Sequence, residues 1–182
     1  MNHKLLLKIA RDAITEELSG KNIIDKVSLL KENPDIFEKG AAFVTLNKNR
    51  DLRGCIGSLV AHRSLLDDLI ANAKAAAFDD VRFLPLTKEE LEDIEIEISI
   101  LSEPKILKYS SIEDLKEKIT PLKDGVILRH ENRQATFLPQ VWEQLNEFEI
   151  FFSHLGQKAG LAADVLKLHP EIFTYRVESF SE

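Results

Sequence analysis

The segment Leu-Arg-Gly-Cys-Ile-Gly, residues 52–57, holds the residue types of this chain that are most able to do chemistry. If it forms a β-strand, Arg53 and Cys55 share a face, with their Cα atoms roughly 7 Å apart. A fixed positive charge near a thiol favours the thiolate, which is the reactive form of cysteine. Gly54 and Gly57 are costly inside a strand and mark a bulge or a close approach by a ligand or another backbone. The pattern therefore predicts the floor of a pocket, with Cys55 and Arg53 as catalytic residues.

The residues alone leave three roles for this segment open. In the first, the protein is an enzyme in which Cys55 is a nucleophile or thiolate ligand and Arg53 is its electrostatic partner or an anion clamp. In the second, the protein is a non-catalytic module that presents a substrate or docks onto other proteins. In the third, the segment is structural, because cysteine is often buried and Arg53 can pair with an acidic neighbour. Two glycines in a short strand are an inefficient way to build only a core, which favours the first two roles.

The other candidate site residues are less specific. His62 is the nearest histidine to Cys55, but it lies in the connecting segment after the strand. Arg82 and Arg53 would suit a small acidic ligand if both line one cleft, whereas the acidic pair before Arg82 is more simply explained by a salt-bridged loop end. The predicted binding residues are Gly54, Gly57, Arg82 and His62.

No metal or cofactor is expected. The five histidines are scattered without ligand spacing, and a single cysteine with dispersed acids makes a structural zinc site a poor interpretation. The sequence also has no Gly-rich phosphate loop, no nucleophile elbow and no dinucleotide-binding fingerprint.

Composition excludes several classes of partner and compartment. The net charge is −7 and no stretch supplies a basic stripe, which argues against nucleic-acid binding. No segment approaches the roughly 20 apolar residues that span a bilayer, and the first residues lack the apolar run of a signal peptide. One cysteine allows no intramolecular disulfide, so we expect a cytoplasmic protein.

Around residues 52–58 the pattern predicts a sheet. Residues 41–46 are apolar and β-branched, and the polar turn that follows them favours a β-hairpin with residues 52–58. Isoleucines alternate with polar residues over 94–100, which is typical of a half-buried antiparallel strand.

Two helices are expected in this half of the chain. The first spans residues 4–19 and ends at Gly20, and the second spans residues 64–78, where Ser64 and Asp67 match a capping box. The alanines of the second helix leave little bulk, so it can lie close to the strands.

The second half of the chain repeats the mixture of helices and short strands. Expected elements are helices at 111–118, from Pro139 to about Leu145 and around 148–155, a hairpin of 126–128 with 135–137, and a closing strand over 173–177. Such a mixture, with two tight hairpins, indicates an α+β fold rather than a parallel doubly wound sheet. We expect a single domain over residues 1–182.

The sequence resembles the AMMECR family, known in bacteria and archaea as protein A of the AmmeMemoRadiSam system. The matching stretches are Phe43–Leu46, the hallmark hexapeptide Leu52–Gly57, Asn72–Ala77, Asp80–Phe83, Glu97–Leu101, Gly125–Leu128, Ala135–Val141 and Lys158–Leu161. Two departures are Val81, where the family often has proline, and Gly156, where prokaryotic members often carry a second cysteine. A mechanism that needs two thiols is therefore not expected here.

The resemblance implies a mostly antiparallel sheet with packed helices, a larger lobe formed from both chain ends, a smaller lobe, and a cleft beside the hexapeptide strand. It also implies an association with a Memo-like protein and a radical S-adenosylmethionine enzyme. On that basis we expect an enzyme or substrate-handling component that uses the Arg53 and Cys55 strand. The alternative is a non-catalytic protein-interaction module in which Cys55 is structural.

Overall fold

The computed structural model describes residues 2–182, which form two compact units. The larger unit contains residues 2–101 together with 178–182, so both ends of the chain contribute to it, and residues 102–177 form the smaller unit. Each unit contains its own antiparallel sheet with packed helices, which confirms the predicted α+β class. Within residues 2–182, no helix is both long enough and apolar enough to cross a membrane.

The sheet of the larger unit has the strand order β2-β1-β4-β9, with β3 paired to β1. Its strands are β1 (Lys39–Lys48), β2 (Asp51–Gly57), β3 (Arg63–Ser64), β4 (Ile94–Leu101) and β9 (Val177–Ser181). The predicted hairpin of β1 and β2 is confirmed, and β1 is also antiparallel to β4. Within the described part of the chain β2 pairs only with β1, so the hexapeptide forms an edge strand.

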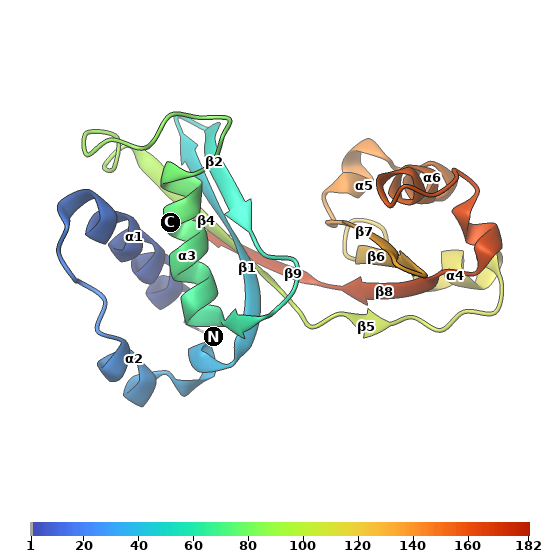
Figure 1. Ribbon diagram of the computed structural model, residues 1–182, viewed down its shortest axis with the longest axis horizontal. Coiled ribbons are helices and arrows are strands. Elements are labelled where there is room, and N and C mark those ends of the chain that lie inside the picture. Colours follow the sequence, from blue (N-terminus) through green and yellow to red (C-terminus); the bar gives the residue numbers. More distant parts are fainter. Residues whose placement is uncertain (1) are drawn as a thin grey trace. The chain divides into compact units, whose positions relative to one another are not determined.

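Two long helices lie on one face of this sheet (Figure 1). The helices of the unit are α1 (His3–Ser19), α2 (Lys26–Glu32), α3 (Leu65–Phe78) and the 3₁₀ turn η1 (Pro34–Phe37). As predicted, α1 ends at Gly20 in the left-handed region and Ser64 caps α3 by accepting from the Asp67 amide. The apolar faces of α1 and α3 bury Val44, Leu46, Ile96 and Ile98 from the strands beneath.

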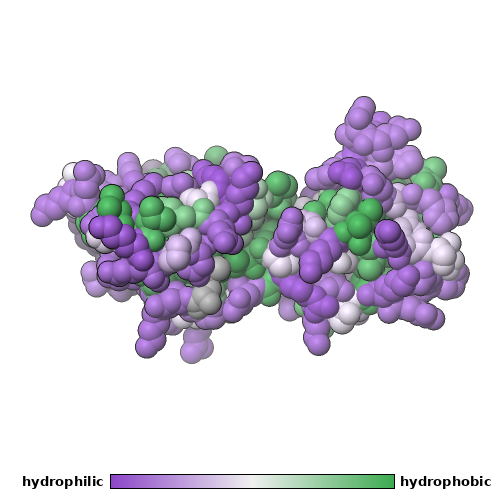
Figure 2. Space-filling model, turned by 90° about the horizontal axis from the view of Figure 1, so that it is seen from below, coloured by the Kyte–Doolittle hydropathy of each residue, from purple (hydrophilic) through white to green (hydrophobic). Residues whose placement is uncertain are grey.

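The short helix α2 is a surface element that the sequence pattern did not predict. It buries none of its residues, and Val27 and Leu30 are exposed. Figure 2 shows this side of the molecule, where apolar side chains gather in small areas within a mostly hydrophilic surface. The helix therefore does not position the strands that carry the hexapeptide.

The smaller unit has the strand order β5-β8-β6-β7. Its elements are β5 (Lys105–Ile106), α4 (Ile112–Lys118), β6 (Gly125–His130), β7 (Arg133–Phe137), α5 (Val141–Gln144), α6 (Phe148–Lys158), the 3₁₀ turn η2 (Val165–Leu168) and β8 (Glu171–Tyr175). Aromatic side chains make its core: the rings of Trp142 and Phe151 are stacked with centroids 3.6 Å apart, and Phe152 meets Phe151 edge-on. The second predicted hairpin, β6 with β7, is confirmed.

Two expectations for this half of the chain were wrong in their boundaries. The closing strand over 173–177 is interrupted at Arg176, so β8 and β9 belong to different sheets. The main chain of Arg176 bonds to Ser102 instead, with its amide donating to the Ser102 hydroxyl and its carbonyl accepting from the Ser102 amide. The helix expected from Pro139 begins only at Val141. Before it the chain forms a turn, in which the amides of Val141 and Trp142 donate to the carbonyls three residues earlier.

Candidate functional site

The two glycines of the hexapeptide are explained by close approaches within the larger unit. A Cβ atom at Gly54 would overlap the carbonyl oxygen of Ala76, so β2 lies against the main chain of α3 at this point. A Cβ atom at Gly57 would overlap the ring of Phe43, its partner in the β1–β2 register. Both glycines therefore allow packing of the protein against itself, and their predicted role in binding a ligand stays a prediction.

The thiol of Cys55 lies on the face of the sheet opposite α1 and α3, and it is partly exposed. Thr45 is its cross-strand partner, and the Thr45 hydroxyl donates a hydrogen bond to Sγ across 3.3 Å. Glu97 is the next residue of the same row on β4.

The main chain of Cys55 is held by two side chains from the loop after α3. Its amide donates to Oδ2 of Asp80 across 2.9 Å, and its carbonyl accepts from Nη2 of Arg82 at 3.3 Å. These two groups occupy the hydrogen-bonding positions that another strand would take on the free edge of β2. The loop therefore closes the sheet edge at the residue that carries the thiol.

Asp80 and Arg82 form the salt-bridged loop end predicted from the sequence. Asp80 is buried and accepts from Nε and Nη2 of Arg82 at 2.9 and 2.7 Å. The hydrogen bond from Arg82 holds the pKa of Asp80 well below its usual range. The same bond raises the pKa of Arg82 above its ordinary value, and the charges of Asp80 and Cys55 add to this rise. Arg82 is thus a cation bound to the main chain of Cys55, and its side chain is about half exposed.

Arg53 is engaged with a different carboxylate. Its Nε and Nη2 donate to the two oxygens of Glu90 at 3.1 and 2.9 Å, and Nη2 also donates to the Leu84 carbonyl at 3.0 Å. Nη1 is buried without a hydrogen-bond partner among residues 2–182. The hydrogen bond from Arg53 lowers the pKa of Glu90 to about 2. The predicted role of Arg53 beside the thiol stays a prediction, and its visible contacts tie the loop to β2.

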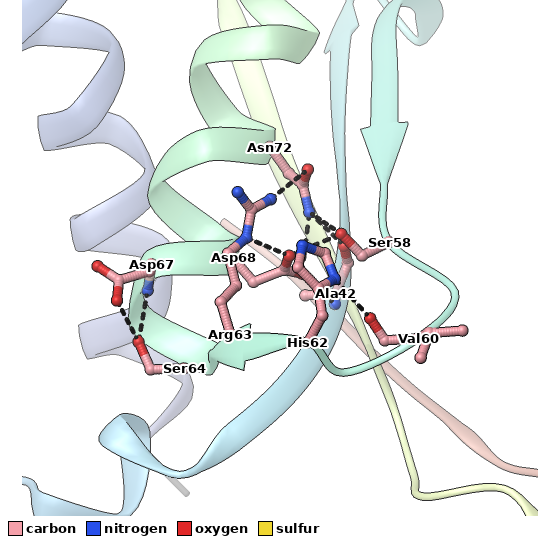
Figure 3. Close-up of polar contacts among 9 residues, drawn as sticks. All are labelled: Ala42, Ser58, Val60, His62, Arg63, Ser64, Asp67, Asp68 and Asn72. Atoms are coloured by element: carbon pink, nitrogen blue, oxygen red, sulfur yellow. Dashed lines mark hydrogen bonds and ion pairs between the residues drawn. The ribbon is translucent and has the colours of Figure 1, made fainter.

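His62 lies in the loop between β2 and β3 and is exposed. Figure 3 shows its Nδ1 atom directed at the carbonyl of Val60, 3.0 Å away. Within the described part of the chain, no hydrogen bond joins a histidine to Cys55. The structure therefore brings Cys55, Arg53 and Arg82 to one strand and its covering loop, and it leaves His62 outside that group of contacts.

A buried polar network beside this loop was missed by the sequence analysis (Figure 3). Asp68 is fully buried and accepts from the Ala42 amide, the Ser58 hydroxyl and Nε of Arg63 at 2.9, 2.6 and 2.8 Å. Asn72 donates to Asp68 and to the Ala42 carbonyl. The available signal was two polar residues four apart on the apolar face of α3. Through Ser58 and Arg63, this network fixes both ends of the segment 58–63 to α3, and Asp68 also bonds to β1.

These contacts limit the chemistry of the site. No group of three or more His, Cys, Asp or Glu side chains within residues 2–182 is arranged to hold a metal ion. What the site offers is a partly exposed thiol, a hydroxyl that donates to it and a half-exposed guanidinium. Such a group can attack an electrophile or bind one through sulfur.

The fold and the hexapeptide define an α+β protein of a known family. Residues 7–180 match the AMMECR1 family, so this chain belongs to it. A protein from Methanothermobacter thermautotrophicus is 38% identical over 97% of this chain and 91% of its own, and a protein from Methanocaldococcus jannaschii is 34% identical over 97% and 88%. The crystal structure of an uncharacterized protein from Pyrococcus horikoshii is similar with a TM-score of 0.78, at 32% identity, covering 98% of this chain and 90% of that one. The resemblance inferred from the sequence is confirmed.

Proposed function

We propose that this AMMECR1-family protein is an enzyme or substrate-handling component that reacts with, or holds, its substrate through the Cys55 thiolate. The observation that carries the proposal is the environment of Cys55: its thiol is partly exposed and accepts a hydrogen bond from Thr45, and the guanidinium of Arg82 donates to the main-chain carbonyl of the same residue. A cysteine that serves only as a small apolar core residue has no need of these groups.

Arg82 takes the electrostatic role in this proposal, and Arg53 takes a positioning role. Arg53 is bound in a fork to Glu90 and its side chain is only 13% exposed, so it is poorly placed to meet a ligand. Arg82 is held along one edge by Asp80 but keeps an exposed side. A small acidic substrate that approaches the thiol would meet Arg82 first.

We also propose a Memo-like protein and a radical S-adenosylmethionine enzyme as partners, which is what the resemblance to the family implies. In that setting the protein would present or modify an intermediate that another component makes or consumes. The single thiol of this chain supports a one-cysteine step over a dithiol step.

The experiment is the alkylation rate of Cys55 with iodoacetamide as a function of pH in the wild type, Arg82→Ala and Arg53→Ala. Removing Arg82 should move the midpoint of the profile to higher pH, because a nearby cation stabilises the thiolate. Removing Arg53 should have a smaller effect. A thiol that reacts only after the protein unfolds would overturn the proposal.

A second candidate is a non-catalytic interaction module, and the loop over β2 is the observation that favours it. Val81 is 99% exposed and Leu84 is 83% exposed on a loop that Asp80 and Arg53 hold in place. A pull-down of the proposed partners separates the two functions. Loss of partner binding in Val81→Asp, with binding retained in Cys55→Ala, would support the interaction module. Loss of partner binding in Cys55→Ala, with binding retained in Val81→Asp, would support the thiol site.

A further inference from the structure

The smaller unit contains a polar pocket in which the Cys55 strand takes no part. Its volume is about 640 Å³, within the range of roughly 300–1,000 Å³ that is usual for small-molecule sites. It is formed by β5, β8, the end of α4 and the turn before β6. Its lining includes Glu103, Lys105, Lys118, Asp124, Thr174 and Arg176.

Arg176 is oriented in this pocket by groups behind it. Its Nε atom is 2.8 Å from Oδ1 of Asp124, whose side chain is only 6% exposed. The other oxygen of Asp124 accepts from the Thr120 amide at 2.6 Å, so both carboxylate oxygens are used. The main chain of Arg176 is fixed by Ser102. Among residues 2–182, a carboxylate contacts the guanidinium only at Nε. The side chain is 56% exposed, which leaves further N–H groups for a ligand.

Further donors come from the neighbouring elements. Lys105 and Thr174 are register partners on β5 and β8, so their side chains share one face of the sheet. Within the described chain Lys105 forms no ion pair. Ser102 accepts from the Arg176 amide, so its own hydroxyl proton is free to donate. Lys118 also lines the pocket, although its ammonium is shared with Asp114 and the Lys108 carbonyl.

The two carboxylates of the lining, Asp124 and Glu103, offset two of its three positive charges, because Asp124 is paired with Arg176 and Glu103 lies beside the lysines. The lining therefore keeps a small excess of positive charge. The ring of Tyr175, which also lines the pocket, packs against Gly125. A Cβ atom at residue 125 would overlap this ring. The Tyr175 hydroxyl bonds to Thr136 and the Phe137 carbonyl, so it belongs to the unit's interior. The pocket therefore has a rigid floor, an excess of donors and at least two cationic groups with free N–H.

We propose that this pocket binds a small oxyanion, the phosphate or carboxylate group of a metabolite. The pocket presents an arginine that a buried carboxylate holds in place, a lysine and two hydroxyls. These groups can form charge-assisted hydrogen bonds with a planar carboxylate or a tetrahedral phosphate. The lining has three cations against two carboxylates, and the protein has a net charge of −7, so the pocket has too little positive charge for a polyanion and favours a small ligand.

The test is titration calorimetry of the whole chain with inorganic phosphate and, separately, with succinate, at constant ionic strength set with chloride. We expect saturable binding of at least one anion. Lys105→Ala should weaken it about 3- to 10-fold, as expected for loss of one partly exposed charge contact. Glu103→Gln should strengthen it, because a repelling carboxylate is removed from the rim. Both residues are exposed, so neither change threatens folding.

Lys123→Ala is the matched control, since Lys123 is an exposed lysine outside the lining. It should leave the affinity unchanged, and Cys55→Ser should also leave it unchanged. Absence of saturable binding for both anions would overturn the proposal. An equal loss of anion affinity in Lys105→Ala and Lys123→Ala would also overturn it, because that result would mean that binding depends only on the overall charge of the protein.

Discussion

The side chain and the main chain of Cys55 have different surroundings. The thiol is left partly exposed beside Thr45, whereas the amide and carbonyl are bound by Asp80 and Arg82. The strand geometry that places Arg53 and Cys55 on one face was predictable from a period of two. The choice of Glu90 as the partner of Arg53 was not, because it depends on a contact between residues 37 positions apart.

The packing of Gly54 on α3 gives the first prediction. Gly54→Ala should destabilise the protein by about 1–3 kcal/mol, because the added methyl group meets a main-chain carbonyl that cannot move alone. Urea denaturation measures the change. Gly57→Ala should also destabilise the protein, because its methyl group would meet both the ring and the main-chain Cα atom of Phe43. A Gly54→Ala variant as stable as the wild type would contradict this account.

The pairing of Glu90 with Arg53 makes stability depend on pH. The pKa of Glu90 is lowered to about 2 in the folded protein, below its ordinary value of 4.5. The carboxylate therefore contributes its full stabilisation above about pH 4.5, and this contribution is lost as the pH falls toward 2. We expect Glu90→Gln to reduce the slope of unfolding free energy against pH in that interval. Denaturation curves at several pH values measure it, and identical slopes in both proteins would refute the expectation.

At the scale of elements, the segment 58–63 and the loop after α3 are the parts that side chains fix in place. The hairpin, the alternating strand β4 and the two long helices follow from local patterns, so the sequence predicted them. The Asp68 network and the break between β8 and β9 depend on partners distant in the chain, which local periodicity does not reveal.

The buried network gives an element-scale prediction. Asp68→Ala should destabilise the larger unit by about 3 kcal/mol or more, because it leaves the Ala42 amide and Arg63 without their buried acceptor. Asp67→Ala removes the same charge one residue earlier, at an exposed position. Asp67→Ala should lower the free energy of unfolding by about 1 kcal/mol or less, because it removes only the contacts with Lys26 and Ser64. Thermal unfolding followed by circular dichroism compares the two variants, and similar losses would count against the network.

At the scale of the whole molecule, the chain has two separate cores, one in each unit. Trp142 is the single tryptophan of the sequence and lies buried in the smaller unit. Its fluorescence therefore reports the unfolding of that unit alone. We expect Asp68→Ala to lower the midpoint seen by circular dichroism by more than the midpoint seen by tryptophan fluorescence. Equal shifts would show that the two cores unfold as one.

We propose that the Cys55 thiol reacts in the native protein from the face of the sheet opposite α1 and α3, and its alkylation profile is the most direct test of this proposal. The account predicts reaction in the native protein, with a midpoint that moves to higher pH in Arg82→Ala and moves less in Arg53→Ala. A native thiol that does not react until denaturant unfolds the larger unit would contradict the account and make Cys55 a structural residue.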